Sequence, residues 1–312
     1  MTETVRVQPR LWRIYHRMNL AALTREEEDE EDGEGDDLGL ASREGRTRLA
    51  WETYSRGGLE HAARAYGTLE RLESRGLGKL SVSLELQDPF APRVMVRSDL
   101  FEPPVMEASL RQVTGHQLGL GRRMAGVPLL FLESLLLQNP GKSFDWHRPP
   151  LPGQQFPGLS LSTEVIQLLL LMARRVGAEG MALRPSTFHA AWTYARHFLF
   201  VDGAAQARFE ALRAEPRLRP LWLLSWALEL GCVLSGGEPV AWTPDLMVAA
   251  LDVKVARAVS TIGRRAALRR AAGRTYRFDL ACLRRRFPWD IMPPRPVPQS
   301  VEELLRPPRG DV

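Results

Sequence analysis

A regular alternation of apolar and polar side chains runs from Leu80 to Asp88. One side carries Leu80, Val82, Leu84 and Leu86, and the other carries Ser81, Ser83, Glu85 and Gln87. Side chains of a strand point to opposite faces in turn, so the pattern predicts a half-buried strand. The prolines that follow predict a turn, and residues 93–97 are expected to form the returning strand.

Three-residue and four-residue spacings of apolar positions predict helices elsewhere in the first half of the chain. Residues 41–75 show this spacing at Leu59, Ala62, Ala63, Tyr66, Leu69 and Leu72, which places these side chains on one helix face. We also expect a short anchoring helix over residues 11–18 and a helix over residues 104–120. The apolar run Leu129–Leu137 fits either a helix or a buried strand, because periodicity does not separate the two.

A proline-rich loop between Ser143 and Glu164 leads into the most apolar helix of the chain. Ser162 is the expected N-cap, and Glu164 in the first turn suits the positive end of the helix dipole. The helix is predicted to end at Val176 and to be buried, since it is apolar nearly all round. A strand over residues 181–184, a helix over 186–198 and a strand over 199–202 are expected to follow.

The chain beyond Asp202 is predicted to be mostly helical. We expect helices over residues 204–214, 218–232 and 245–272, and a short strand over 240–242. The predicted fold class is therefore α+β, helix-rich with a small central sheet. We expect a peripheral segment over residues 1–40, one large domain over 41–285 and a proline-rich extended tail over 286–312.

Charge is distributed unevenly along the chain, which carries a formal net charge of +5. Ten acidic and no basic residues lie between Glu26 and Asp37, and arginines cluster in the last third. An acidic block of this kind is typical of a solvated linker. Alternatively, it competes with an anionic partner for the basic face. Only three of the 42 basic residues are lysines, which we interpret as a coding preference.

Cysteine usage and the chain's apolar stretches bear on its compartment. Cys232 and Cys282 are too few for a disulfide framework or a cysteine zinc site. The N-terminal sequence lacks the basic start and apolar segment of a secretory signal. No apolar stretch reaches the roughly 20 residues of a membrane span. We therefore expect a cytoplasmic protein with both cysteines reduced and no membrane partner.

The order of loop, helix, strand, helix and strand across residues 148–202 resembles the central motif of GNAT-type acetyltransferases. The turn Gln155-Phe156-Pro157-Gly158-Leu159-Ser160 stands where that family binds pyrophosphate, and Tyr194 stands where it has a tyrosine on the next helix. The sequence departs from the family pattern in four ways. The turn has one glycine, Pro157 lacks an N–H donor, and Ser160 replaces a small glycine or alanine. At the end of the next helix, His197-Phe198 stands where the family usually has Gly-Phe.

The resemblance implies transfer of an acyl group from acetyl-CoA to an amine. Tyr194 would protonate the leaving thiolate, and Glu85 on the predicted strand is our candidate general base. A backbone N–H near Asp145 would stabilise the thioester carbonyl. Free N–H groups and the positive end of a helix form an anion site. The residues that would bind the pyrophosphate there are Gln154, Gln155, Gly158, Leu159 and Ser160.

Two functions of other classes remain open. A non-catalytic interaction or scaffold protein would bind a protein partner through the acidic segment or the basic C-terminal helix, and the missing donor at Pro157 would then be harmless. A zinc-dependent deacetylase-like hydrolase would use Asp145 and His147 as ligands. Residues two apart on an extended strand point to the same side, so this pair could share one ion.

Nucleic acid is a less favoured partner. Arg257, Arg264 and Arg265 give the predicted helix over residues 245–272 a basic side, which could contact phosphates non-specifically. Few aromatic residues accompany these arginines, so the sequence does not favour this partner. The chain also contains no P-loop, no dinucleotide-binding fingerprint and no G-x-S-x-G elbow.

Overall fold

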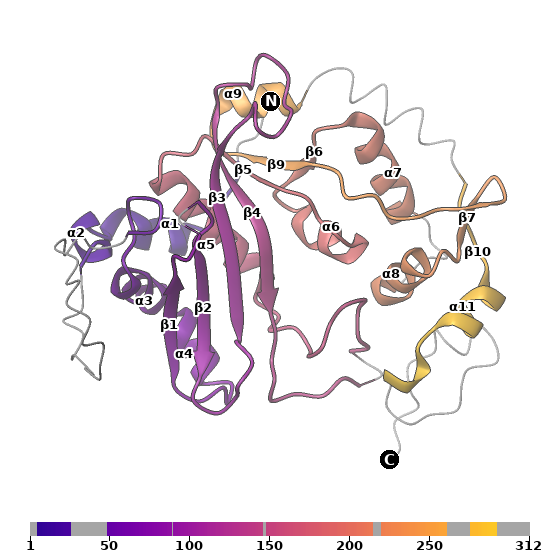
Figure 1. Cartoon of the computed structure of the whole chain (residues 1–312), viewed down its shortest axis with the longest axis horizontal. Coiled ribbons are helices and arrows are strands. Elements are labelled where there is room, and N and C mark those ends of the chain that lie inside the picture. Colours follow the sequence, from indigo (N-terminus) through magenta and orange to yellow (C-terminus); the bar gives the residue numbers. More distant parts are fainter. Residues whose placement is uncertain are drawn as a thin grey trace, which may run out of the picture.

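The computed structural model describes residues 5–25, 49–88, 90–145, 148–214, 220–260 and 275–291. They form a mixed α/β fold around a seven-stranded sheet with the strand order β1-β2-β3-β4-β5-β9-β6 (Figure 1). A separate three-stranded sheet has the order β10-β7-β8. The mixed fold class is confirmed, but the central sheet is larger than the small sheet that the sequence predicted.

The first four strands form an antiparallel meander of β1 (Leu80–Glu85), β2 (Arg93–Ser98), β3 (Met106–Thr114) and β4 (Pro128–Leu137). The predicted strand and its returning partner are confirmed, since Leu80 pairs with Ser98 and Glu85 with Arg93. The predicted helix over residues 104–120 is wrong, because this segment pairs with both β2 and β4. The same pairing makes the ambiguous apolar run of β4 a strand.

β4 and β5 (Gly180–Leu183) run parallel and are connected by α5 (Ser162–Arg175), as a parallel pair requires a crossover. Their pairing ends at Leu132 and Leu183, after which β4 continues to Leu137 without a β5 partner. The predicted buried helix is confirmed, since seven of the side chains of α5 are buried. The sheet therefore opens between β4 and β5 at one end.

β9 (Met247–Ala250) lies between β5 and β6 (Leu199–Phe200) and is antiparallel to both. The predicted helix over residues 245–272 is therefore wrong at its start, and α9 (Val253–Val259) is the only helix described within it. The first three residues of β9 are all buried. A strand buried on both faces reads as a continuous apolar run without alternation, so its sequence resembles a buried helix.

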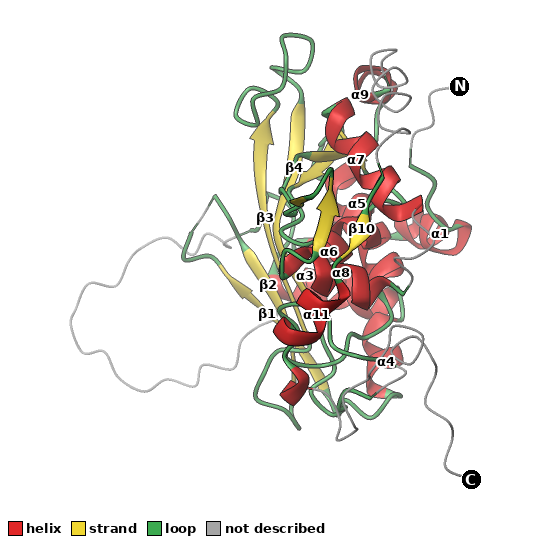
Figure 2. Cartoon of the chain, turned by 90° about the vertical axis from the view of Figure 1, so that its right-hand side faces the viewer, coloured by secondary structure: helices red, strands yellow, loops and turns green. Residues whose placement is uncertain are grey.

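Most helices lie on one side of the β1–β4 meander (Figure 2). Besides α5, the helices of the main core include α3 (Arg56–Ala65), α4 (Thr68–Glu73), α6 (Phe188–Tyr194), α7 (Gly203–Ala214) and α8 (Leu221–Glu229). Buried side chains such as Leu69, Ile166 and Phe209 join these helices and the sheet in one continuous core. Val255 and Val259 of α9 pack in a separate cluster with Leu129 and Val248.

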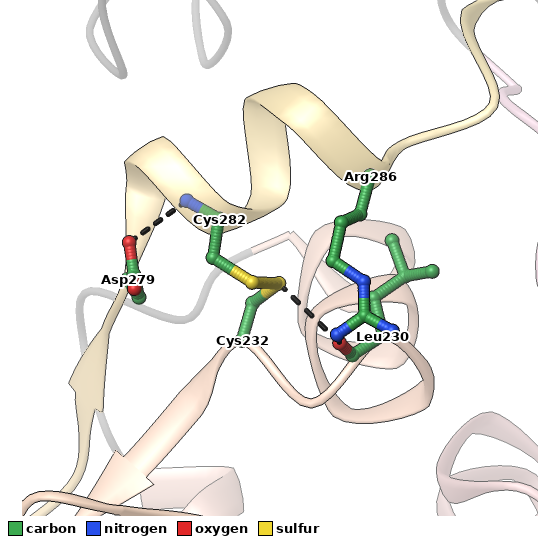
Figure 3. Close-up of a disulfide and its surroundings, with 5 residues drawn as sticks. All are labelled: Leu230, Cys232, Asp279, Cys282 and Arg286. Atoms are coloured by element: carbon green, nitrogen blue, oxygen red, sulfur yellow. Dashed lines mark hydrogen bonds between the residues drawn. A yellow bond between two sulfur atoms is a disulfide. The ribbon is translucent and has the colours of Figure 1, made fainter.

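The small sheet consists of β7 (Val233–Ser235), β8 (Glu238–Pro239) and β10 (Arg277–Phe278), followed by α11 (Leu280–Arg286) and a short 3-10 helix at Trp289–Ile291. Cys232 and Cys282 form a disulfide that ties α11 to the segment after α8 (Figure 3). The expectation that both cysteines are reduced is therefore wrong. The two residues are 50 positions apart, so sequence spacing alone gave no signal for this bond.

The N-terminal segment folds as α1 (Pro9–Arg17) and α2 (Leu20–Leu23), which confirms the predicted anchoring helix. Leu11 and Leu23 are fully buried. Arg175 of α5 donates a hydrogen bond of 2.7 Å to the carbonyl of Tyr15, and its guanidinium lies over the Tyr15 ring. Residues 5–25 are therefore fastened to the domain by burial and by a cation–π contact.

Several predicted features lie outside the described residues. These are the acidic block Glu26–Asp37, His147, the pair Arg264 and Arg265, and the tail beyond Ile291. Among the helices that the structure describes, none combines the length and apolar character needed to cross a membrane.

Candidate functional site

A cavity with a volume of about 730 Å³ lies where β4 and β5 part. Its walls come from the end of β4 with Leu135–Gln138, the loop Leu151–Ser160, and Ser186–Tyr194 on and before α6. Pro103, Pro104 and Glu107 close a further side. An opening between parallel strands beside a helix start is a common position for ligand sites in α/β folds.

Six of the seven residues that sequence analysis placed in the acetyltransferase site line this one cavity. They are Gln154, Gln155, Gly158, Leu159, Ser160 and Tyr194. The seventh, Glu85, does not line it and lies on β1, two strands from β3. At the usual strand spacing this is about 10 Å from β3. The structure thus brings together the turn and the tyrosine but not the candidate base.

Arginines hold the turn before α5 in an unusual conformation. Ser160 has a φ of 57°, in the left-handed region that favours glycine. Arg148 Nη2 donates to the Ser160 hydroxyl at 2.7 Å and to the Gly158 carbonyl at 3.2 Å. Arg75 Nη1 donates to the Leu159 carbonyl at 2.8 Å. These contacts from two distant segments fix the carbonyls of the turn and leave its N–H groups available.

The amino-terminal end of α5 presents unpaired N–H groups beside the cavity. The predicted cap is wrong by one residue, since Leu161 occupies the N-cap position and makes no side-chain cap. In the described part of the chain, no acceptor meets the N–H groups of Ser162, Thr163 or Glu164. Such groups, with the helix dipole behind them, attract an anion.

Positive charge surrounds this helix end. In addition to Arg75 and Arg148, Arg196 Nη1 donates to the Thr163 hydroxyl at 3.3 Å. Arg71 forms a bidentate ion pair with Glu164, so it neutralises the carboxylate in the first turn. The local balance therefore favours a polyanionic ligand such as a pyrophosphate.

The last five residues of β4, Glu133–Leu137, form a free strand edge, and Leu135–Leu137 of this edge line the cavity. On one side this segment pairs with β3. On the other side, no described strand pairs with it beyond Leu132. An exposed strand edge binds an extended ligand that carries amide groups, because those groups can continue the hydrogen-bond ladder.

Tyr194 at the end of α6 presents a neutral hydroxyl to the cavity. Burial raises its pKa to about 12, so the phenol keeps its proton throughout the neutral range. The ring packs edge-on against Phe198 with centroids 5.8 Å apart. Within the described residues, no hydrogen bond engages the hydroxyl, which leaves it available to a ligand.

His189 also lines the cavity, one turn and a half before Tyr194 on the same helix, and sequence analysis did not assign it to this site. Its Nε2 lies 3.2 Å from the Thr187 hydroxyl. Its Nδ1 is buried, and no described atom hydrogen-bonds to it. Burial lowers its pKa to about 4, so the imidazole is neutral at pH 7. The signal that could have found it is its position on the tyrosine-bearing helix.

Glu107 on β3 is the carboxylate in the cavity wall, and sequence analysis missed it. Its Oε1 lies 3.5 Å from Nε of Arg93, which stands between it and Glu85 on β1. The side chain is 23% exposed, so a ligand can reach it. The error followed from the helix predicted for residues 104–120, which gave no reason to place Glu107 beside the turn.

The metal alternative gains no support from the described residues. No group of three or more His, Cys, Asp or Glu side chains there could hold an ion. The Asp145 carboxylate accepts a hydrogen bond of 2.7 Å from the Arg148 backbone N–H, so it is already used within its own loop. Its predicted partner His147 lies outside the described residues.

Comparison of the sequence with protein-family models gives no match, and neither does comparison with curated proteins. The features that bear on function are therefore the cavity between β4 and β5, the turn that Arg75 and Arg148 contact, and the side chains of Tyr194, His189 and Glu107 in the cavity wall.

Proposed function

We propose that the protein is an acyl-CoA-dependent N-acyltransferase of the GNAT type, with its thioester site in the cavity between β4 and β5. The observation that carries this proposal is the convergence of the turn Gln154–Ser160 and Tyr194 on one cavity of about 730 Å³. These segments come from different elements, the loop before α5 and the helix α6.

The phosphate end of the ligand would bind at the start of α5. The free N–H groups of Ser162, Thr163 and Glu164 supply donors there. Arg148 and Arg75 add positive charge. Pro157 removes only one donor, and its carbonyl accepts a bond of 2.7 Å from the Asn139 N–H outside the turn. The departures from the family turn therefore leave an anion site intact.

The pantetheine arm would lie along the free edge of β4. This arm is extended and carries two amide groups, which match the unpaired backbone groups of Glu133–Leu137. A pantetheine arm bound along this edge would place its thioester end where β4 and β5 part. Tyr194 and Glu107 both line that cavity, on opposite sides of β4.

The proposed reaction forms a C–N bond between an acceptor amine and the acyl carbon and breaks the C–S bond of the thioester. Tyr194 gives its hydroxyl proton to the departing thiolate. Glu107 accepts the proton that the amine nitrogen loses, which keeps the reaction balanced in protons. His189, neutral at pH 7, adds an uncharged imidazole to the same cavity wall.

Thermal unfolding with and without excess CoA tests the proposal directly. A ligand at about 100 times its Kd stabilises the folded state by roughly 2.7 kcal/mol, which raises Tm by several degrees. Gly158→Trp should abolish this rise by filling the cavity. Gly158→Ala is the matched control, because a Cβ there meets nothing nearer than the Leu137 carbonyl oxygen at 3.6 Å.

The proposal fails if millimolar CoA leaves Tm unchanged in the unmodified protein. The non-catalytic interaction protein would then be the better hypothesis, and partner capture with the acidic block deleted would be the next experiment. An equal rise in the Gly158→Trp variant would place CoA elsewhere on the molecule and would also overturn the proposal.

A further inference from the structure

A second cavity lies on the helix side of the meander, between the sheet and α1, α3 and α5. Its volume is about 140 Å³. Most of its wall is apolar, and includes Leu59, Ala62, Val82, Ala108, Leu135 and Leu169. An apolar cavity of about this size accommodates a benzene molecule, so a group of about six carbons fits.

The two cavities adjoin each other at the centre of the sheet. Glu107 and Leu135 line both of them. Leu135 pairs across the strands with Ala108, and both side chains face the helices, whereas the Glu107 carboxylate points to the opposite face of the sheet. Leu135, at the free edge of β4, is therefore the side chain at which the two cavities meet.

The polar groups in the wall of the second cavity carry no negative charge of their own at neutral pH, apart from Glu107 at the junction. Burial raises the pKa of Tyr66 to about 12 and raises that of Tyr54 as well, so both phenols are neutral. Arg175 is engaged by the carbonyls of Tyr15 and Met18, at 2.7 and 3.3 Å. Apart from the Arg175 guanidinium, which these carbonyls hold at the wall, the interior is mostly apolar, so a hydrocarbon group that fills it is removed from water.

We propose that this second cavity binds the acyl group of the thioester, and that the preferred donor carries a hydrocarbon acyl group of about six carbons rather than acetyl. The inference rests on the proposed acyltransferase function, since it needs the thioester carbonyl in the first cavity. It adds the class of acyl donor to that function. The acyl chain passes Leu135 and displaces no charged side chain.

Calorimetric titration with CoA, acetyl-CoA, hexanoyl-CoA and succinyl-CoA tests the inference without requiring an acceptor. Each methylene buried in an apolar site strengthens binding by about fourfold. Hexanoyl-CoA should therefore bind at least tenfold more tightly than acetyl-CoA. Succinyl-CoA should bind no better than acetyl-CoA, because its terminal carboxylate would have to be desolvated.

Two substitutions on α3 form a matched pair. Ala62 lines the second cavity, and Ala65 on the same helix is exposed. Ala62→Phe should fill the cavity and remove the preference for hexanoyl-CoA while CoA itself binds as before. Ala65→Phe should keep the preference. Tm of each variant without ligand shows whether it is folded.

Each outcome distinguishes this inference from the function on which it rests. If CoA fails to bind, the acyltransferase proposal is wrong and the inference falls with it. If CoA binds but hexanoyl-CoA gains less than tenfold over acetyl-CoA, the inference alone is overturned. The same holds if succinyl-CoA binds as tightly as hexanoyl-CoA, or if a folded Ala62→Phe variant retains the chain-length preference.

Discussion

The guanidinium of Arg148 donates a hydrogen bond of 2.7 Å to the hydroxyl of Ser160, across a loop of 12 residues. A second bond from the same Nη2 reaches the Gly158 carbonyl. Ser160 has a positive φ, a backbone conformation that costs free energy for any residue other than glycine. It persists only where contacts from the surrounding structure offset that cost. Arg148 is therefore a positioning residue for the turn and also brings positive charge to the start of α5.

Replacing Arg148 with alanine is expected to weaken CoA binding by about tenfold, which corresponds to about 1.4 kcal/mol. The turn loses the donor that holds Ser160, and the anion site loses one charge. The Kd from calorimetric titration at two salt concentrations measures both effects, since the variant should also show a weaker salt dependence. Arg123→Ala, at the exposed tip of the β3–β4 hairpin, is the control. Equal losses in the two variants would contradict a specific role for Arg148.

Replacing Tyr194 with phenylalanine is expected to lower kcat by about a hundredfold or more and to leave the Kd for CoA unchanged. The hydroxyl is the proton donor, and with a pKa of about 12 it stays protonated from pH 7 to 10. Deprotonation of Tyr194 should therefore cause no fall in wild-type kcat between pH 7 and pH 10. A thiol reagent in the presence of primary amines reports released CoA, since both cysteines of the chain are joined in a disulfide. An unchanged kcat in the variant would exclude Tyr194 as the acid.

His189 makes folding stability depend on pH. Burial lowers its pKa in the folded chain from 6.5 to about 4. The unfolded chain therefore binds more protons than the folded chain between these values, so stability is full above pH 6.5 and falls as the pH drops toward 4. The difference corresponds to on the order of 3 kcal/mol.

The substitution His189→Gln is accordingly expected to remove most of this acid-dependent loss. Urea unfolding at pH 7 and pH 4.5 gives the change in the free energy of unfolding for each protein, and the contributions of carboxylates cancel in the comparison with wild type. His61→Gln, at an exposed position of α3, should unfold with the acid sensitivity of wild type. His197, whose pKa burial also lowers, leaves a remainder in both variants. If the His189→Gln variant lost as much free energy of unfolding between pH 7 and pH 4.5 as wild type does, the imidazole would not be buried in its neutral form.

The disulfide between Cys232 and Cys282 is expected to contribute up to about 4 kcal/mol to stability. It closes a loop of 50 residues, and the chain-entropy relation gives this value for such a loop. Thermal unfolding with and without a reducing agent measures the loss. The Cys282→Ser variant should have the Tm of the reduced wild-type protein, and adding the reducing agent should not change it. A thiol titration of the native protein that finds two free thiols would contradict the bond.

Short-range patterns determined several elements of this protein. The alternation from Leu80 to Asp88 identified β1, because one face of that strand is buried and the other is not. The nearly all-apolar sequence after Ser162 identified α5, because the helix is buried on most sides. The turn around Gly158 and the tyrosine on the next helix were singled out differently, by a resemblance to the central motif of GNAT-type acetyltransferases.

Tertiary structure decided the features that depend on pairing between distant segments. Met247–Ala250 becomes β9 because β5 and β6 offer it hydrogen-bonding edges on both sides, and nothing within those four residues separates a buried strand from a helix. Residues 106–114 become β3 for the same reason, which brings Glu107 to the cavity. The bond between Cys232 and Cys282 likewise requires two segments to meet. Local sequence sets which conformations a segment can adopt at low cost, whereas hydrogen bonds and burial between segments far apart in the chain select one of them.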